Sequence, residues 1–309
     1  MKYNTALRAL APLLFALVAL GGAMSAYAAP AYDPEFKYAE LDTGIKLAYV
    51  ELGNSGGHPV VFLHGVTDSY LSFSQVAPLV AAEGNRVIVV ELRGHGHSDK
   101  PKDGPYTVDL HVSDIASLLS KLGIKNANIT GHSLGSFIAQ GLAARHPEYV
   151  SSLTLIGSAA AVKGNETLAW LLDGGDGFEG VNNAAALSDE FLTDWTASTN
   201  YDESFAPRTY EHAKSLPIEV WRNAVNGISA FTDELGKIQV PVQIIYGGDD
   251  AFFSRDDQAD LIKRLGSKYI LFQTKPGVGH NTHWEGHLDS EIASDIVSFI
   301  RAANEAQGK

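Results

Sequence analysis

The sequence predicts a three-layer α/β domain, with a mostly parallel sheet flanked by helices and a helical cap insertion. Short, continuous runs rich in β-branched residues recur at 59–65, 86–92, 126–130, 151–157, 241–247 and 268–274. Runs of this kind suit parallel strands that are buried on both faces. Helical patterns alternate with them at 107–122, 134–146 and 289–303. Such alternation is typical of a three-layer domain. An opening hairpin is expected at 36–52, with its turn at 42–44.

One long segment breaks this alternation. From 160 to 232 no convincing strand pattern occurs, and the segment is acidic and rich in tryptophan. We interpret 160–232 as a helical cap insertion over the strand ends. It divides the core domain into 29–159 and 233–309. Most aromatic side chains of the cap are expected to fill its own core.

The first residues have the pattern of a secretory signal peptide. Lys2 and Arg8 precede the apolar run "LAPLLFALVALGGAM", and the pattern "AYA" at 26–28 has the small residues typical of a cleavage site. We expect a signal peptide over 1–28. A membrane anchor is the alternative, but the run is short for a span and Gly21 and Gly22 weaken it. The mature protein is therefore expected in the periplasm or outside the cell, without a membrane anchor.

Composition excludes several classes of function. The chain has 309 residues and no cysteine, so disulfides, thiol nucleophiles and cysteine metal sites are excluded. Its formal net charge is −13. An acidic protein repels nucleic acids and anionic membranes, although simple solubility also explains such a charge. We expect no nucleic-acid partner.

The stretch "NITGHSLGSFIAQG" places a serine where a strand should become a helix. A tight turn there forces strained backbone angles on Ser133, and Gly131 and Gly135 remove the clash that Cβ atoms two residues away would cause. The N–H of Leu134 then points from a helix N-terminus at whatever the serine attacks. An ordinary structural turn needs none of these features. The pattern therefore favours a nucleophile.

A serine nucleophile needs a base, which is usually a histidine oriented by a carboxylate. Asp249 and Asp250 follow one predicted strand, and His280 follows the next. Loops after strand ends are where an open α/β sheet collects its ligands. The chain order of serine, acid and histidine also fits this architecture. One of the two aspartates is expected to cap the next helix instead.

Five motifs together resemble the α/β-hydrolase superfamily, over essentially the whole chain after residue 28. They are "HGVTDSYLSF", "ELRGHGHSDKP", "GHSLG", "YGGDD" and "GVGHNTHWE". The second has Glu91 where aspartate is more frequent. The resemblance implies the α/β-hydrolase fold.

The same resemblance implies roles for individual residues. It carries Ser133, Asp250 and His280 into a catalytic triad, and the backbone N–H groups of Val66 and Leu134 into an oxyanion hole. Asp250 is preferred over its neighbour because the family's acid normally lies three residues past the glycine that ends the strand.

The nucleophile limits the chemistry. Dehalogenases and epoxide hydrolases of this fold use an aspartate where this chain has Ser133, so those activities are disfavoured. We expect hydrolysis of a small carboxylic ester or lactone with an apolar part, without a cofactor. C–C bond hydrolases and perhydrolases share the triad and remain alternatives. A non-catalytic ligand-binding member is a further one, although it would not need an activated serine.

Aromatic and histidine residues near the triad are candidates for substrate binding. We expect His132, Trp284, Trp170 and Trp195 to line the pocket, with packing as the alternative role for the first two. Another interpretation is a zinc site, because suitable spacings occur at His280, His283, Glu285 and His287. Because His280 is already assigned, we expect no metal.

Overall fold

The computed structural model describes residues 30–104, 106–175, 177–197 and 204–308. The predicted signal peptide at 1–28 lies outside the described residues. Eight strands form one sheet in the order β1-β2-β4-β3-β5-β6-β7-β8. Their bounds are β1 Lys37–Glu40, β2 Lys46–Gly53, β3 Pro59–Leu63, β4 Arg86–Val90, β5 Ala127–His132, β6 Val150–Ile156, β7 Val242–Gly247 and β8 Ile270–Lys275. The structure thus confirms all six predicted strand runs, with shifts of a few residues at their ends.

The sheet is parallel from β4 through β8 and antiparallel at the edge that β1 and β2 form. These two strands are the predicted hairpin, with Lys37 opposite Tyr49. Gly44 in its turn has a φ of 81°, which glycine adopts without a Cβ penalty.

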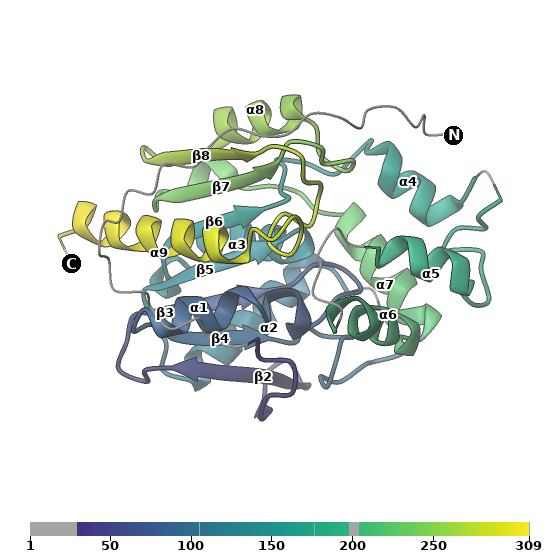
Figure 1. The fold of residues 1–309 in the computed structure, drawn as a ribbon, viewed down its shortest axis with the longest axis horizontal. Coiled ribbons are helices and arrows are strands. Elements are labelled where there is room, and N and C mark those ends of the chain that lie inside the picture. Colours follow the sequence, from purple (N-terminus) through teal and green to yellow (C-terminus); the bar gives the residue numbers. More distant parts are fainter. Residues whose placement is uncertain (1–29, 105, 176, 198–203, 309) are drawn as a thin grey trace, which may run out of the picture.

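Helices cover both faces of the sheet, as Figure 1 shows. On one face α1 and α9 pack together over a cluster that includes Val60 and Phe62. On the other face α2, α3 and α8 pack on a larger cluster that includes Val61 and Leu63. The helix bounds are α1 Val76–Ala82, α2 Val108–Lys121, α3 Leu134–Arg145, α8 Arg255–Arg264 and α9 Asp289–Ala306. Because successive residues of β3 face opposite clusters, the strand is apolar at every position.

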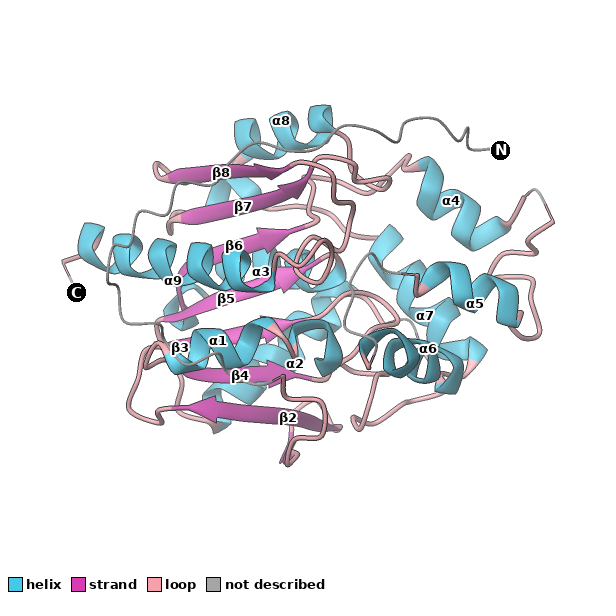
Figure 2. Cartoon of the chain, viewed as in Figure 1, coloured by secondary structure: helices cyan, strands magenta, loops and turns pink. Residues whose placement is uncertain are grey.

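Between β6 and β7 the described residues form four helices and no strand of the sheet. These inserted helices are α4 Glu166–Asp173, α5 Asp189–Trp195, α6 Phe205–Ser215 and α7 Ile218–Ser229. Short 3₁₀ turns occur at η1 Tyr70–Phe73, η2 Pro147–Tyr149 and η3 Leu235–Lys237. The arrowheads of the parallel strands point toward the inserted helices (Figure 2). No helix in the described ranges combines the length and apolarity needed to cross a bilayer.

Candidate active site

Ser133 occupies a strained turn between β5 and α3. Its φ is 49° and its ψ is −116°, a conformation that non-glycine residues rarely adopt. A Cβ on Gly131 would lie 2.2 Å from the Gly135 carbonyl oxygen, and one on Gly135 would lie 2.0 Å from the Leu63 carbonyl oxygen. Both glycines are therefore required, because the elbow closes on itself and α3 presses against β3.

His280 and Asp250 form a hydrogen-bonded pair at the ends of β8 and β7. The His280 Nδ1 atom lies 2.9 Å from Oδ2 and 3.1 Å from Oδ1 of Asp250. The backbone N–H groups of Phe252 and Phe253 also donate to Oδ1, at 2.8 Å and 3.1 Å. These donors fix the carboxylate, whose side chain is completely buried. Asp249 is exposed.

The loop that carries His280 is shaped by two neighbours. Glu285 accepts hydrogen bonds from the backbone N–H groups of Gly279 and Asn281, at 2.6 Å and 3.2 Å. Gly157, after β6, leaves room for the imidazole, because a Cβ there would lie 2.9 Å from His280 Cε1. The Glu285 hydrogen bonds and the space beside Gly157 together determine the position of the His280 imidazole ring.

The two backbone N–H groups predicted for an oxyanion hole are unused. Within the described part of the chain, neither Val66 nor Leu134 donates its backbone N–H to another group. Val66 lies in the loop after β3, and Leu134 is the first residue of α3. Buried N–H groups are normally paired, so unpaired ones beside Ser133 leave donors for a ligand.

The loop after β3 is held by hydrogen bonds from both the core and the inserted helices. Thr67 has a φ of 62°, unusual for a β-branched residue. Its N–H donates to His95 Nε2 at 3.0 Å, and its hydroxyl donates to the Val66 carbonyl at 2.6 Å. Trp195 Nε1, from α5, donates to the same hydroxyl at 3.0 Å. These contacts fix the peptide that follows Val66.

Two buried histidines support this loop as neutral rings. Burial lowers the pKa of His64 well below its usual value and that of His95 to about 4. In each ring Nδ1 bonds a backbone carbonyl and Nε2 accepts from a backbone N–H. A nitrogen that accepts a hydrogen bond carries no proton, so the hydrogen-bond geometry and the lowered pKa values both indicate that His64 and His95 are neutral.

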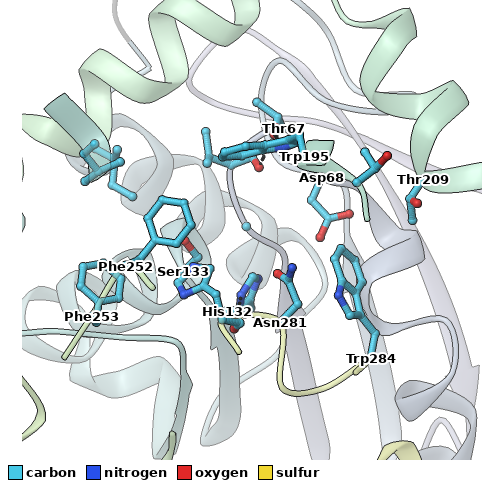
Figure 3. A pocket seen from close by; sticks show the side chains of 16 residues that line it. Thr67, Asp68, His132, Ser133, Trp195, Thr209, Phe252, Phe253, Asn281 and Trp284 are labelled. Carbon is cyan, nitrogen blue, oxygen red and sulfur yellow. Dashed lines mark hydrogen bonds between the residues drawn. The ribbon is translucent and has the colours of Figure 1, made fainter. Parts of the chain in front are cut away.

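Ser133 opens into a partly enclosed cavity between the sheet and the inserted helices. In Figure 3, Phe252 and Phe253 lie on one side of Ser133, and Asp68, Thr209 and Trp284 lie on the other. The lining residues are Gly65, Val66, Thr67, Asp68, His132, Ser133, Leu168, Trp195, Thr196, Thr209, Ile228, Phe252, Phe253, His280, Asn281 and Trp284. The two phenyl rings and the carboxyl group of Asp68 therefore lie on opposite sides of Ser133.

Of the four residues predicted to line a pocket, three do so. His132, Trp195 and Trp284 border the cavity, whereas Trp170 does not. Trp170 is 38% exposed, packs against Phe178 with the two rings tilted, and donates from Nε1 to the Gly175 carbonyl. It faces away because the buried face of α4 is made by its leucines instead.

The residues considered for zinc have other partners. Glu285 holds the histidine loop, and His283 Nε2 lies 2.7 Å from the Ser72 hydroxyl. Burial lowers the pKa of His283 to about 3, and that of His132 also falls well below its usual value. Within the described ranges, no group of three or more potential ligands could hold a metal ion.

Sequence reasoning missed several residues that line the cavity, notably Thr67, Asp68, Phe252, Phe253 and Asn281. Thr67, Asp68 and Asn281 lie inside recognised motifs, and Phe252 and Phe253 lie just past the end of one, so position in or beside those motifs was an available signal. Lining residues from the inserted helices gave no comparable signal, because their placement depends on tertiary packing.

Comparison with known proteins identifies the family. The family model described as "alpha/beta hydrolase fold" matches residues 58–287. The chain belongs to this family. The 2-hydroxymuconate semialdehyde hydrolase of Pseudomonas sp. (strain CF600) is 29% identical over 90% of this chain and 98% of its own length.

Two further relatives match less of the chain or only its fold. Lipase 1 of Psychrobacter immobilis is 34% identical over 41% of this chain and 40% of its own length. The enol-lactonase structure from Burkholderia xenovorans LB400 superposes with a TM-score of 0.69 and 20% identity. It covers 86% of this chain and 100% of that one. The protein is thus a member of a hydrolase family that includes enzymes with different substrates.

Proposed function

We propose that this protein is an exported serine hydrolase that cleaves a small carboxylic ester or lactone through an acyl-enzyme on Ser133. The observation that carries the proposal is Ser133 in a strained elbow, bordering the same cavity as His280, which is paired with the buried carboxylate of Asp250. A strained residue persists only where the surrounding structure maintains it, and such residues cluster at functional sites.

The mechanism follows from these groups. Asp250 accepts the Nδ1 proton of His280, which leaves Nε2 free to take the hydroxyl proton of Ser133. The serine oxygen attacks the carbonyl, and the N–H groups of Val66 and Leu134 stabilise the oxyanion, each by about 3–4 kcal/mol. His280 then returns its proton to the departing alcohol. Water activated by His280 hydrolyses the acyl-enzyme in the same way.

The cavity lining supports a neutral substrate with an apolar part. None of the described residues that border the cavity is a lysine or arginine, and Asp68 is among them. An anionic substrate would therefore meet a carboxyl group without a compensating cation. The phenyl rings of Phe252 and Phe253 offer the apolar surface. We further propose that the inserted helices act as a cap that closes this cavity.

A C–C bond hydrolase is the second candidate, because the relative from Pseudomonas sp. (strain CF600) matches over nearly its whole length. That reaction would use the same serine and histidine. The absence of a cation from the described lining weighs against the carboxylate-bearing substrate that this relative's name indicates.

Turnover assays separate the two candidates. p-Nitrophenyl butyrate, dihydrocoumarin and 2-hydroxymuconate semialdehyde are offered to the wild type, to Ser133→Ala and to Ser113→Ala. Ser113 is an exposed serine of α2 and serves as the matched control. We expect Ser133-dependent turnover of the ester or the lactone. Turnover of the semialdehyde alone would establish the C–C hydrolase, and ester turnover that persists in Ser133→Ala would refute the proposed nucleophile.

Export is tested separately, by expression of the full chain in a bacterial host and fractionation. The proposal predicts a periplasmic or secreted product whose intact mass begins at Ala29. A product that retains Met1 in the cytoplasmic fraction would contradict it.

A further inference from the structure

The carboxyl group of Asp68 has unused hydrogen-bonding capacity at the wall of the cavity. Its Oδ1 atom accepts from the Ser69 backbone N–H at 2.7 Å. Its Oδ2 atom is shielded from solvent and has no hydrogen-bond partner within the described residues. A shielded polar atom without a partner costs free energy, so a group that donates to it gains affinity.

The backbone of Asp68 is fixed by the inserted helices. His212 of α6 lies with Nε2 at 2.8 Å from the Asp68 carbonyl oxygen. The side chain nevertheless remains adaptable, because terminal carboxyl torsions have broad energy wells. To meet a ligand, Oδ2 has to turn about Cβ–Cγ toward the cavity that Asp68 borders.

We propose that Asp68 is a specificity-determining residue, whose carboxyl group binds a hydroxyl group on the substrate. The inference rests on the proposed function, because it concerns the substrate of the Ser133 site. The ester or lactone would place its apolar part against Phe252 and Phe253, and its hydroxyl on the side of Asp68 and Thr209 (Figure 3).

A hydroxyl fits this position better than a cation does. Burial raises the pKa of Asp68 to about 7, although hydrogen bonding from the nearby Ser72 side chain, whose hydroxyl also lies 2.7 Å from His283 Nε2, and from the Ser69 N–H lowers it. Both protonation states are therefore populated near neutral pH. A hydroxyl can donate to the charged form and accept from the neutral one, whereas an ammonium can only donate. The neighbouring Thr209 and Asn281 are also uncharged.

The test compares pairs of esters that differ in one hydroxyl. 2-Hydroxyethyl butyrate is paired with propyl butyrate, and methyl 6-hydroxyhexanoate with methyl heptanoate. The two pairs place the hydroxyl on the alcohol part and on the acyl part. The measured quantity is the ratio of kcat/KM values within each pair. A hydrogen bond to a charged group contributes enough to change that ratio by about tenfold or more.

The variants are Asp68→Leu, Asp68→Asn and the control Asp194→Asn. Leucine has a similar size but no polar atom, and asparagine keeps an acceptor for the Ser69 N–H. Asp194 is an exposed carboxylate of α5, so its loss controls for net charge. We expect the preference for the hydroxylated ester in at least one pair to fall about tenfold in Asp68→Leu. In Asp68→Asn it should fall less, and in Asp194→Asn it should not change.

Two outcomes overturn the proposal. The first is a folded Asp68→Leu variant in which the ratio of kcat/KM values stays at the wild-type value for both pairs of esters. The other is a preference for butyrylcholine over 3,3-dimethylbutyl butyrate that depends on Asp68 while the hydroxyl ratios do not. That pattern would show that the Asp68 carboxyl group binds a cationic group of the substrate and not a hydroxyl. Turnover of propyl butyrate that depends on Ser133 would leave the proposed function intact in either case.

Discussion

Replacement of Thr67 by valine tests whether the loop after β3 is a preorganised oxyanion hole. Valine keeps the β-branched shape but removes the hydroxyl that donates to the Val66 carbonyl and accepts from Trp195 Nε1. The hydrogen bond between the Thr67 N–H and His95 Nε2 remains. The variant therefore loosens the peptide between Val66 and Thr67, and it removes neither of the N–H groups of the proposed oxyanion hole.

The magnitude follows from two lost hydrogen bonds. Each contributes about 0.5–1.5 kcal/mol net, so the total is about 1–3 kcal/mol. If this energy orients the hole, it acts on the transition state, and kcat should fall by roughly 5- to 150-fold while KM changes little. The assay is steady-state hydrolysis of p-nitrophenyl butyrate, with the thermal midpoint measured to confirm folding.

Thr209→Val is the matched control. Thr209 borders the same cavity, but its hydroxyl donates to the Ala206 carbonyl within α6 and does not contact the loop. Its kcat should stay within about twofold of the wild type, because no contact to the hole is lost. Equal kcat values for the two variants, or an effect of Thr67→Val confined to KM, would refute the reasoning.

Three further predictions concern the neighbouring groups. Asp250→Asn should lower kcat by about 10³- to 10⁴-fold, because the wrong tautomer of His280 is then favoured. Asp249→Asn should have little effect. Equal losses of kcat in the two variants would reject Asp250 as the acid. Gly157→Ala should lower kcat in a folded protein, because the new Cβ would lie 2.9 Å from His280 Cε1. Unchanged kinetics would show that the position of the His280 imidazole is not critical. Burial raises the pKa of Asp68 to about 7, so the folded state holds this proton more tightly and its stability falls as pH rises from about 4 to about 7. Asp68→Asn should therefore gain thermal midpoint over the wild type across that range, measured by calorimetry; a constant difference would contradict the shift.

The sequence predicted the strands well because both faces of the central sheet are covered. Residues such as Val60 and Phe62 face one cluster while Val61 and Leu63 face the other, so burial appears directly as an apolar run. The prediction that Asp249 or Asp250 caps the next helix was wrong, because the N-cap residue of α8 is Ser254. Ser254 and Asp257 form a capping box there, a local signal that periodicity alone does not detect.

The candidate site was predictable where local backbone geometry determines it. Glycine is required at 131 and 135 because a Cβ at either position would lie about 2 Å from a carbonyl oxygen. Of the three tryptophans predicted to line the pocket, the two in the inserted segment could not be told apart from the sequence. Trp195 borders the cavity and Trp170 does not, although both lie in acidic helical surroundings. Their difference arises from how α4 and α5 dock on the sheet, which periodicity cannot specify.

Covalent labelling of the proposed nucleophile tests the central claim most directly. The purified protein is treated with a fluorophosphonate, and the adduct is located by intact mass and peptide mapping. The account predicts one adduct per chain, on Ser133, which is absent from Ser133→Ala and slowed in Asp250→Asn. Labelling at another serine, or no labelling of a folded wild-type protein, would contradict the assignment of Ser133 as an activated nucleophile.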